Sequence, residues 1–246
     1  MAAVVREGLI GLGCFLGYYA GMLAVLAVLR AAFHFSGELF RKLLHAVAFT
    51  SVFVLLYAVD TWYAAILVAQ SFAALVYGLI RLVERFLWTM SFLEERRAGE
   101  IRSSLLLAFA MMSILIAVFW GWLGEEWKYV VVVAVLAWGV GDGAAALVGK
   151  AFGRRRIRHR LVEGTKTLEG TAAMAATAGL SILGSLLVFT SFPWFVCLAV
   201  TALVAPLAAA VELFSRRGSD TFTVPLATAA ATFALISLIG YWGGIR

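Results

Sequence analysis

Long apolar runs separated by short polar segments dominate the pattern of this chain. Most of these runs reach the roughly 20 residues that a helix needs to cross a bilayer. They cover residues 8–33, 43–58, 62–80, 103–121, 128–149, 168–190, 194–214 and 220–243. The pattern therefore predicts an all-α integral membrane protein, a bundle of about eight transmembrane helices that forms a single domain over residues 1–246.

The composition agrees with this pattern. Of the 246 residues, 63% are hydrophobic and only 14% are charged, whereas about a quarter of the residues in a typical soluble domain are charged. The first run is too long, and its flank insufficiently basic, for a cleaved signal peptide, so we expect a true first span. Cys14 and Cys197 lie inside apolar runs without the spacing of a metal or disulfide site, and we expect them to be core residues.

The basic residues are distributed unevenly among the segments that join the runs. Alternate segments, near residues 41–42, 81–102, 150–166 and 216–217, hold nearly all the Lys and Arg residues. Because positively charged loops stay in the cytoplasm, this distribution predicts eight spans with both termini outside and these four segments at the cytoplasmic face. Such loops also attract anionic lipid headgroups, which is the ordinary explanation for the 81–102 loop.

The densest of these segments is the loop at about 150–167, and residues suited to phosphate chemistry flank it. A Gly-rich apolar segment before the loop carries one carboxylate, Asp142, and the loop ends at Lys166 and Glu169. A carboxylate, a cluster of cations and then Lys and Glu at a membrane boundary suit a metal-bound polyphosphate. The glycines also have a packing explanation, because small residues spaced four apart let helices approach closely.

Four carboxylates lie at predicted cytoplasmic helix ends, where a charge in or near hydrocarbon needs a reason. They are Asp142, Glu169, Glu212 and Asp220. Carboxylates gathered without matching Cys or His side chains favour a hard cation such as Mg²⁺, which shares its ligands with substrate phosphates. A second explanation is that each carboxylate pairs with a nearby Arg or Lys.

A second polar cluster leads into the second apolar run. Arg41 and Lys42 lie four and three residues before His45, so all three share one face of a helix. That face can present two cations and an imidazole at the membrane surface. Alternatively, Arg41 and Lys42 anchor the helix at the interface and His45 is a core residue.

Several common catalytic motifs are absent from the sequence. There is no G-x-x-x-x-G-K-[ST] phosphate loop, so the chain is not a P-loop ATPase. The motifs H-E-x-x-H, G-x-S-x-G and paired C-x-x-C are also absent, which argues against the common metalloprotease, hydrolase and zinc-site classes. Any nucleotide site is therefore built differently.

A set of short motifs resembles the CTP-dependent polyprenol kinase family, which includes dolichol kinases, phytol kinases and CTP-dependent diacylglycerol kinases. The motifs are R-K-L-L-H at 41–45, G-D-G-A-A-A-L-V-G-K at 141–150, K-T-L-E-G at 166–170, E-L-F at 212–214 and S-D-T-F-T-V-P-L at 219–226. K-T-x-E-G also occurs in phosphatidate cytidylyltransferases, but their P-G-H-G-G signature is absent here, which favours a kinase. Many family members have Asp-Asn where this chain has Asp220-Thr221, so the carboxylate is kept and the amide is lost.

The resemblance implies an enzyme that transfers the γ-phosphoryl group of CTP to a lipid hydroxyl, with Mg²⁺ as cofactor, in an active site at the cytoplasmic face. We expect a catalytic set of Asp142, Glu169, Lys166 and His45, and metal ligands among Asp142, Glu169, Glu212 and Asp220. Lys166 would neutralise charge on the transferred group, and the arginines would clamp the other phosphates. The residues expected to bind the nucleotide are Arg41, Lys42, Gly141, Gly143, Lys150, Arg154, Arg155, Arg156, Arg158, Arg160, Lys166 and Thr167.

The acceptor and the general base stay open at this point. Family membership alone favours an isoprenoid alcohol (dolichol, another polyprenol, phytol or geranylgeraniol), with diacylglycerol as the next choice. The competing hypotheses are a phosphatidate cytidylyltransferase, a transporter for an anionic solute and a non-catalytic lipid-binding scaffold. The expected partners are CTP, the membrane lipid alcohol and the bilayer, with no nucleic acid; either a carboxylate or His45 could orient the hydroxyl.

Overall fold

The computed structural model describes residues 2–33, 37–86, 100–162, 166–216 and 218–243. Within these ranges the chain is helical, apart from connecting segments and a single β-bridge between Arg156 and Thr167. The chain divides into two compact units, Met1–Gly121 and Trp122–Arg246, and each unit is described by itself.

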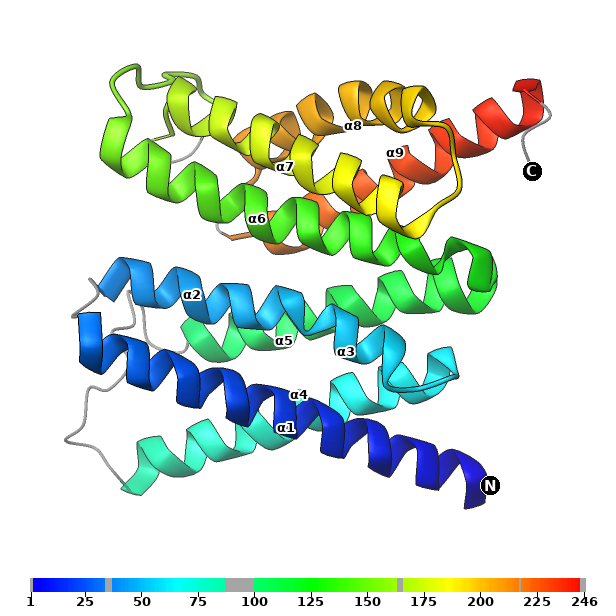
Figure 1. Cartoon of the computed structure of the whole chain (residues 1–246). Helices are drawn as coiled ribbons and strands as arrows, with labels where there is room; N and C mark the ends of the chain where they lie inside the picture. Colours follow the sequence, from blue (N-terminus) through cyan, green and yellow to red (C-terminus); the bar gives the residue numbers. More distant parts are fainter. Residues whose placement is uncertain (1, 34–36, 87–99, 163–165, 217, 244–246) are drawn as a thin grey trace. The chain divides into compact units, whose positions relative to one another are not determined.

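The described residues of the first unit form five α-helices and a π-helical end. These elements are α1 (Ala2–Phe33), α2 (Gly37–Thr50), α3 (Val52–Tyr57), α4 (Trp62–Phe86), α5 (Glu100–Leu115) and the π-helix η1 (Ile116–Trp122), which runs into the second unit. Helix α1 packs against α2, α3 and α4, and α4 also packs against α5. In Figure 1 these helices are drawn in blue to green.

The predicted second span is divided between α2 and α3, which meet at Ser51. Two tyrosines of α1 bind this junction: the hydroxyl of Tyr18 donates to the carbonyl oxygen of Val47 at 2.9 Å, and that of Tyr19 donates to Ser51 Oγ at 3.3 Å. The ring of Tyr19 stacks on Phe72 of α4 with the ring centroids 4.3 Å apart. The hydrogen bonds therefore join the helix break to the aromatic core of this unit.

The short connection between α3 and α4 is capped from α1. A carboxylate oxygen of Glu7 accepts hydrogen bonds from the main-chain N–H of Asp60 at 2.8 Å and of Thr61 at 2.9 Å. It also accepts one from the hydroxyl of Thr61 at 2.9 Å. Free N–H groups at the beginning of a helix favour an acceptor of this kind, so Glu7 stabilises the start of α4.

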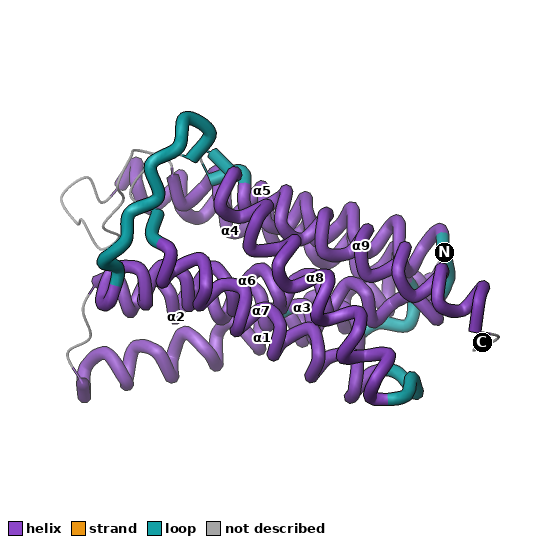
Figure 2. Tube along the Cα trace, turned by 90° about the horizontal axis from the view of Figure 1, so that it is seen from above, coloured by secondary structure: helices purple, strands orange, loops and turns teal. Residues whose placement is uncertain are grey.

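The second unit is a bundle of four long helices. It contains the short 3₁₀-helix η2 (Glu125–Trp127), then α6 (Lys128–Phe152), α7 (Leu168–Phe189), α8 (Trp194–Phe214) and α9 (Asp220–Gly243). Helix α6 packs against the other three long helices, while α7 packs against α8 and α8 against α9. Figure 2 shows loop structure confined to the ends of the helices.

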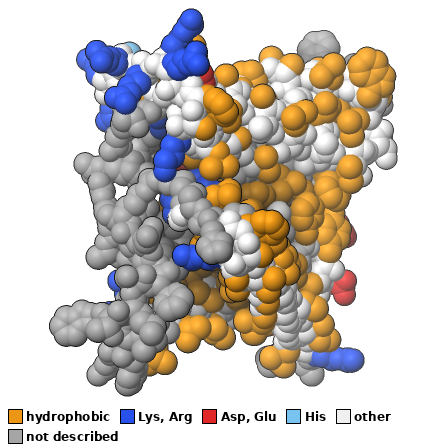
Figure 3. All heavy atoms as spheres, turned by 60° about the vertical axis from the view of Figure 1, so that its left-hand side comes forward, with side chains coloured by type: hydrophobic (Ala, Val, Ile, Leu, Met, Phe, Trp, Pro, Cys, Tyr) orange, Lys and Arg blue, Asp and Glu red, His pale blue; other side chains and the backbone are white. Residues whose placement is uncertain are grey.

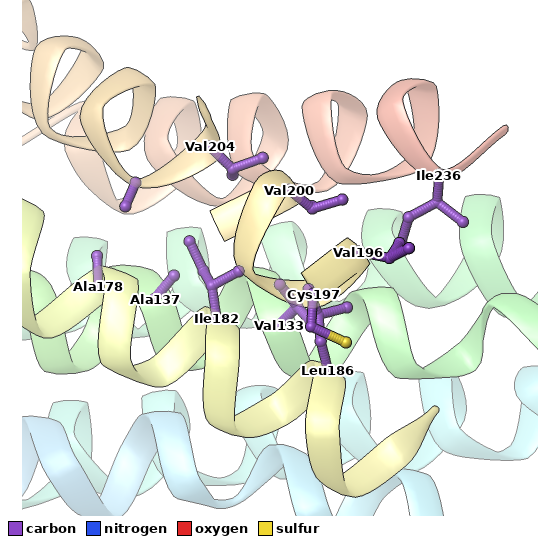
Figure 4. Close-up of a cluster of buried hydrophobic side chains, with 11 residues drawn as sticks. Val133, Ala137, Ala178, Ile182, Leu186, Val196, Cys197, Val200, Val204 and Ile236 are labelled. Atoms are coloured by element: carbon purple, nitrogen blue, oxygen red, sulfur yellow. The ribbon is translucent and has the colours of Figure 1, made fainter. Parts of the chain in front are cut away.

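Apolar side chains from all four of these helices form the core of the second unit. Figure 4 shows Ile182 of α7 between Ala137 of α6 and Val200 of α8, while Ile236 of α9 lies beside Val196 of α8. Cys197 lies in the same cluster and is fully buried, as predicted. Cys14 on α1 is exposed, so the prediction of a core residue is wrong for that cysteine. The core holds the helices together, and the polar residues of interest lie at one end of it.

The predicted membrane spans are confirmed. In the described part of the chain, eight helical segments are long and apolar enough to cross a bilayer, and each overlaps one predicted run. They are Val4–Phe33, Leu39–Tyr57, Trp62–Leu82, Arg102–Trp122, Glu125–Phe152, Leu168–Phe189, Trp194–Phe214 and Asp220–Tyr241. The chain is therefore a multi-pass integral membrane protein.

Candidate functional site

The K-T-L-E-G motif forms the beginning of α7. Thr167 is the N-cap residue, and its Oγ1 accepts a hydrogen bond from the main-chain N–H of Gly170 at 3.1 Å. Such a cap satisfies one of the N–H groups that a first helical turn leaves without a partner. Glu169 lies in the same turn, where a negative charge is favoured by the helix dipole.

Glycines allow the end of α6 to approach the beginning of α7 closely. A Cβ atom added to Gly170 would lie 3.0 Å from the carbonyl oxygen of Ala145 and 3.3 Å from Cα of Gly149. One added to Gly153 would lie 2.7 Å from Cγ2 of Thr167. The packing explanation therefore accounts for these three glycines, and their small size brings Thr167 against α6.

The two glycines that flank Asp142 have different surroundings. A Cβ atom at Gly141 would overlap the sulfur of Met174 on α7, so Gly141 leaves room for the end of that side chain. A Cβ atom at Gly143 would have no atom within 4 Å. Close packing thus explains Gly141, while the nucleotide-binding role expected for either glycine stays a prediction.

Lys166 forms an ion pair with Glu212. Lys166 precedes α7 and Glu212 lies in the last turn of α8, yet Lys166 Nζ is 2.9 Å from Glu212 Oε1 and also donates to the main-chain oxygen of Glu212. The two side chains are 23% and 11% exposed, respectively. The last carbonyl groups of a helix attract cations, so both the carboxylate and the helix end hold the ammonium group. Glu212 thus pairs with a nearby cation, as the second explanation for the carboxylates expects.

Asp142 and Asp220 complete a charged cluster around this pair. Asp220 is the first residue of α9 and is half-buried, and it interacts electrostatically with Asp142, Lys166 and Glu212. Three carboxylates and one ammonium group thus converge from α6, α8, α9 and the beginning of α7. We call these four residues, Asp142, Lys166, Glu212 and Asp220, the charged cluster.

Asp142 lies deeper along its helix than the sequence pattern predicted. The span that contains it, Glu125–Phe152, has 28 residues, and Asp142 lies ten residues before its end. A helix of that length extends about 42 Å at 1.5 Å per residue, which exceeds the roughly 30 Å of bilayer hydrocarbon.

A turn supported by hydroxyl groups joins the two helix ends that carry Glu212 and Asp220. Ser215 Oγ lies 2.7 Å from Thr223 Oγ1, and Ser219 Oγ accepts from the main-chain N–H of Arg216 at 3.2 Å. Gly218 takes a φ of 79° in this turn, a conformation that glycine adopts without strain. Ser and Thr spaced four apart around a Gly are a capping signal that the sequence interpretation did not use.

The basic loop between α6 and α7 is held along the beginning of α7. The main-chain N–H of Ile157 donates to the oxygen of Lys166, and that of Leu168 donates to the oxygen of Arg155, both at 2.9 Å. The carboxylate of Glu169 accepts hydrogen bonds from the main-chain N–H groups of Arg154 and Arg155, each at 3.2 Å. Glu169 thus binds the loop backbone, and its predicted role as a metal ligand stays a prediction.

The arginine side chains of this loop extend outward. Arg154, Arg155, Arg156, Arg158 and Arg160 are all exposed, as is Lys150 in the last turn of α6. In Figure 3, Lys and Arg side chains gather at the upper left of the surface. The predicted cation cluster therefore exists as an exposed basic surface beside the beginning of α7.

Arg216 connects the far end of this loop to the turn between α8 and α9. Its Nη2 donates to the main-chain oxygen of Arg160 at 2.7 Å, and its Nε donates to that of Leu161 at 3.4 Å. The ring of His159 also lies near Phe214 at the end of α8, with the centroids 6.4 Å apart. From the sequence, Arg216 was assigned to the cytoplasmic face but to no part of the site, because no spacing links it to a segment about 55 residues earlier.

Arg41, Lys42 and His45 belong to α2, in the other unit. They lie within one helical turn, as predicted, and all three are half-buried. The ring of His45 packs edge-on against Phe49 with the centroids 5.7 Å apart. That these residues line the same site as the charged cluster stays a prediction.

The residues of the charged cluster suit a magnesium–nucleotide complex better than a metal held by protein ligands alone. In the described part of the chain, no three His, Cys, Asp or Glu side chains are arranged to hold a metal ion. Mg²⁺ in nucleotide sites needs only one or two carboxylates, because water and phosphate oxygens complete its shell. Asp142 and Asp220 interact electrostatically, and their role as Mg²⁺ ligands stays a prediction.

Among known proteins, the chain is similar to a phytol kinase from Synechocystis sp., with 37% identity over 112 residues. The match covers 42% of this chain and 42% of the length of that kinase. No protein-family model matches the chain, and no solved structure does.

Proposed function

We propose that this chain is a membrane kinase that transfers the γ-phosphoryl group of CTP to the hydroxyl group of a membrane isoprenoid alcohol. The similarity to a phytol kinase supports membership of the CTP-dependent polyprenol and phytol kinase family, the family that the motifs resemble. The observation that carries the proposal is the convergence of the charged cluster beside an exposed basic loop. Opposite charges placed this closely suit a substrate that carries both a cation and phosphates.

The carboxylates of Asp142 and Asp220 would hold Mg²⁺ at the triphosphate. Both are oxygen donors, which Mg²⁺ prefers, and their mutual repulsion favours a cation between them. When bound, Mg²⁺ would neutralise part of the charge that develops on the phosphates during transfer. Asp220 begins α9, so the turn between α8 and α9 fixes its carboxylate relative to Glu212.

Lys166 would bind the transferred γ-phosphoryl group. Its ammonium group is already held at the cluster by Glu212, and its flexible stem allows it to exchange a carboxylate oxygen for a phosphate oxygen. The exposed guanidinium groups of the loop would bind the other phosphates, because their planar forks match phosphate oxygens. The bond from the γ-phosphorus to the β–γ bridging oxygen breaks, and a bond from that phosphorus to the lipid oxygen forms.

The proton of the lipid hydroxyl leaves during this transfer. A carboxylate of the charged cluster or the imidazole of His45 would accept it, and the products are the lipid monophosphate and CDP. The hydroxyl of a membrane lipid lies at the boundary of the bilayer while its tail remains among apolar helices. We propose that this boundary is the cytoplasmic one, because the basic residues gather in the loops on that side.

Two labels on CTP test this function. Purified protein in detergent with Mg²⁺ is given CTP labelled at the α- or γ-phosphate and a panel of phytol, geranylgeraniol, polyprenol, dolichol, diacylglycerol and phosphatidate. We expect γ-label in an isoprenoid monophosphate and α-label in CDP. Label in phosphatidic acid would instead identify a diacylglycerol kinase, and a CDP-lipid with released pyrophosphate would identify a cytidylyltransferase. If no acceptor consumes CTP, the kinase proposal is wrong and transport or lipid binding is tested next.

A further inference from the structure

Arg216 has no part in the proposed phosphoryl transfer, yet its side chain makes specific contacts. It lies in the turn between α8 and α9, and its guanidinium binds two successive main-chain oxygens, those of Arg160 and Leu161. A guanidinium presents its donors in a rigid planar fork, so one side chain can hold both carbonyl groups at once. The exposed loop is thereby attached to a segment about 55 residues later in the chain.

The basic loop is attached near both of its ends. Near its start, the main-chain N–H groups of Arg154 and Arg155 donate to the carboxylate of Glu169. Near its far end, Arg216 supplies the hydrogen bonds, and the ring of His159 lies near that of Phe214. The first attachment joins the loop to α7, whereas the second joins it to the α8–α9 turn, which leads directly into Asp220.

We propose that Arg216 is a positioning residue that holds the basic loop against the α8–α9 turn, so that the loop arginines and the charged cluster bind the same triphosphate. The proposal rests on the proposed function, because it needs a ligand that both regions bind. A loop that is free at one end must be ordered again whenever the ligand binds. The conformational entropy lost in that ordering weakens binding. Once the triphosphate is bound, the reacting groups are in place. Loss of the Arg216 attachment should therefore raise KM more than it lowers kcat.

The test compares Arg216→Ala and Arg216→Lys with the unaltered protein, each purified in detergent. Arg6→Ala is the matched control, because Arg6 is an exposed arginine on α1 of the other unit. Two quantities are measured: the rate of trypsin cleavage after the loop arginines, located by mass spectrometry, and the kinetics with CTP as the varied substrate. Trypsin cleavage reports the attachment of the loop without any need for activity.

We expect Arg216→Ala to raise trypsin cleavage between residues 154 and 160 several-fold and to raise KM for CTP roughly tenfold, with kcat within about twofold. Arg216→Lys should give intermediate values, because an ammonium group lacks the fork that binds two carbonyls. Arg6→Ala should change neither quantity. An unchanged KM for Arg216→Ala, or a loss confined to kcat, would overturn the positioning role while leaving the kinase intact. If the unaltered protein neither binds nor consumes CTP, both proposals are wrong.

Discussion

Two connections at one end of the four-helix unit are built in opposite ways. The α6–α7 connection is a loop bound through its backbone, and its arginine side chains remain exposed. The α8–α9 connection is a short turn closed by hydroxyl groups, with the half-buried Asp220 on one side and the buried Glu212 on the other. The first therefore presents cations to solvent, and the second presents carboxylates toward the interior of the bundle.

The difference shows how a small polar site can exist on an apolar scaffold. Exposed arginines cost little, because they stay hydrated until a phosphate replaces water. A buried carboxylate is costly unless a cation is near, and Lys166 supplies one from the loop side, 2.9 Å from Glu212 Oε1. Lys166 and Arg216 both join the two connections, but only Lys166 also belongs to the charged cluster. Lys166 is therefore the best residue at which to separate structural from catalytic roles.

The largest expected effect comes from removing a charge on the acidic side. Asp142→Asn keeps the size of the side chain but removes the negative charge proposed to hold Mg²⁺, and we expect kcat to fall about 10²- to 10³-fold. The γ-phosphoryl transfer assay measures this loss, with an unchanged elution profile in detergent as the check on folding. Glu125→Gln is the matched control, because Glu125 is exposed before the start of α6. Activity retained in Asp142→Asn would rule out the role given to this carboxylate.

The second prediction separates the two roles of Lys166. Lys166→Ala leaves the carboxylate of Glu212 without its ion-pair partner at 11% exposure, so we expect a loss of about 1–3 kcal/mol in stability together with loss of phosphoryl transfer. Adding Glu212→Gln removes the stranded charge and should restore the apparent melting temperature in detergent. Transfer activity should stay absent in this double variant. If the double variant regains activity, the lysine has only a structural role.

The third prediction concerns the hydroxyl group that begins α7. Thr167→Ala removes the cap on the N–H of Gly170, which should cost about 1 kcal/mol and lower the apparent melting temperature by about 2–4 °C. Thr167→Ser keeps the hydroxyl and should retain most of the stability, so the pair isolates the cap from the methyl contact with Gly153. Equal losses in the two variants would show that the methyl group, and not the cap, stabilises this helix end.

Much of the fold could be predicted because the bilayer imposes a simple pattern. Each of the eight apolar runs corresponds to a helical segment that can span a membrane, since a helix in hydrocarbon must satisfy its own backbone. The hydrogen bonds of Tyr18 and Tyr19 with the α2–α3 junction were not predicted, because the partners lie about 30 residues apart in the chain. Apolar periodicity within a span contains no signal for such a partner.

The composition of the candidate site could also be predicted, but its internal pairing could not. Charges near hydrocarbon need a reason, and this argument singles out the carboxylates Asp142, Glu169, Glu212 and Asp220, while the K-T-L-E-G motif adds Lys166. The structure brings Lys166 together with three of these carboxylates, Asp142, Glu212 and Asp220. The contacts of Glu169 with the loop backbone depend on how the loop folds back, and side-chain spacing does not encode that path. For the same reason Arg216 was missed, although its position beside a Gly-containing turn was visible.

The smallest expected effect comes from single arginines on the basic side, and its salt dependence sharpens the contrast between the two connections. Arg158 is exposed, so Arg158→Ala should raise KM for CTP only about two- to fivefold at low ionic strength, with kcat retained. The rise should shrink toward unity near 0.5 M salt, because exposed charges are then screened within about 4 Å. The defect of Asp142→Asn should persist under the same conditions, since a partly buried carboxylate proposed to contact the metal is screened much less.

Steady-state kinetics at several salt concentrations, with Arg6→Ala as the control, distinguish the two responses. A salt-independent effect at Arg158 would mean that its guanidinium binds phosphate directly in a desolvated site, and the description of the loop as a solvent-exposed basic surface would then be wrong.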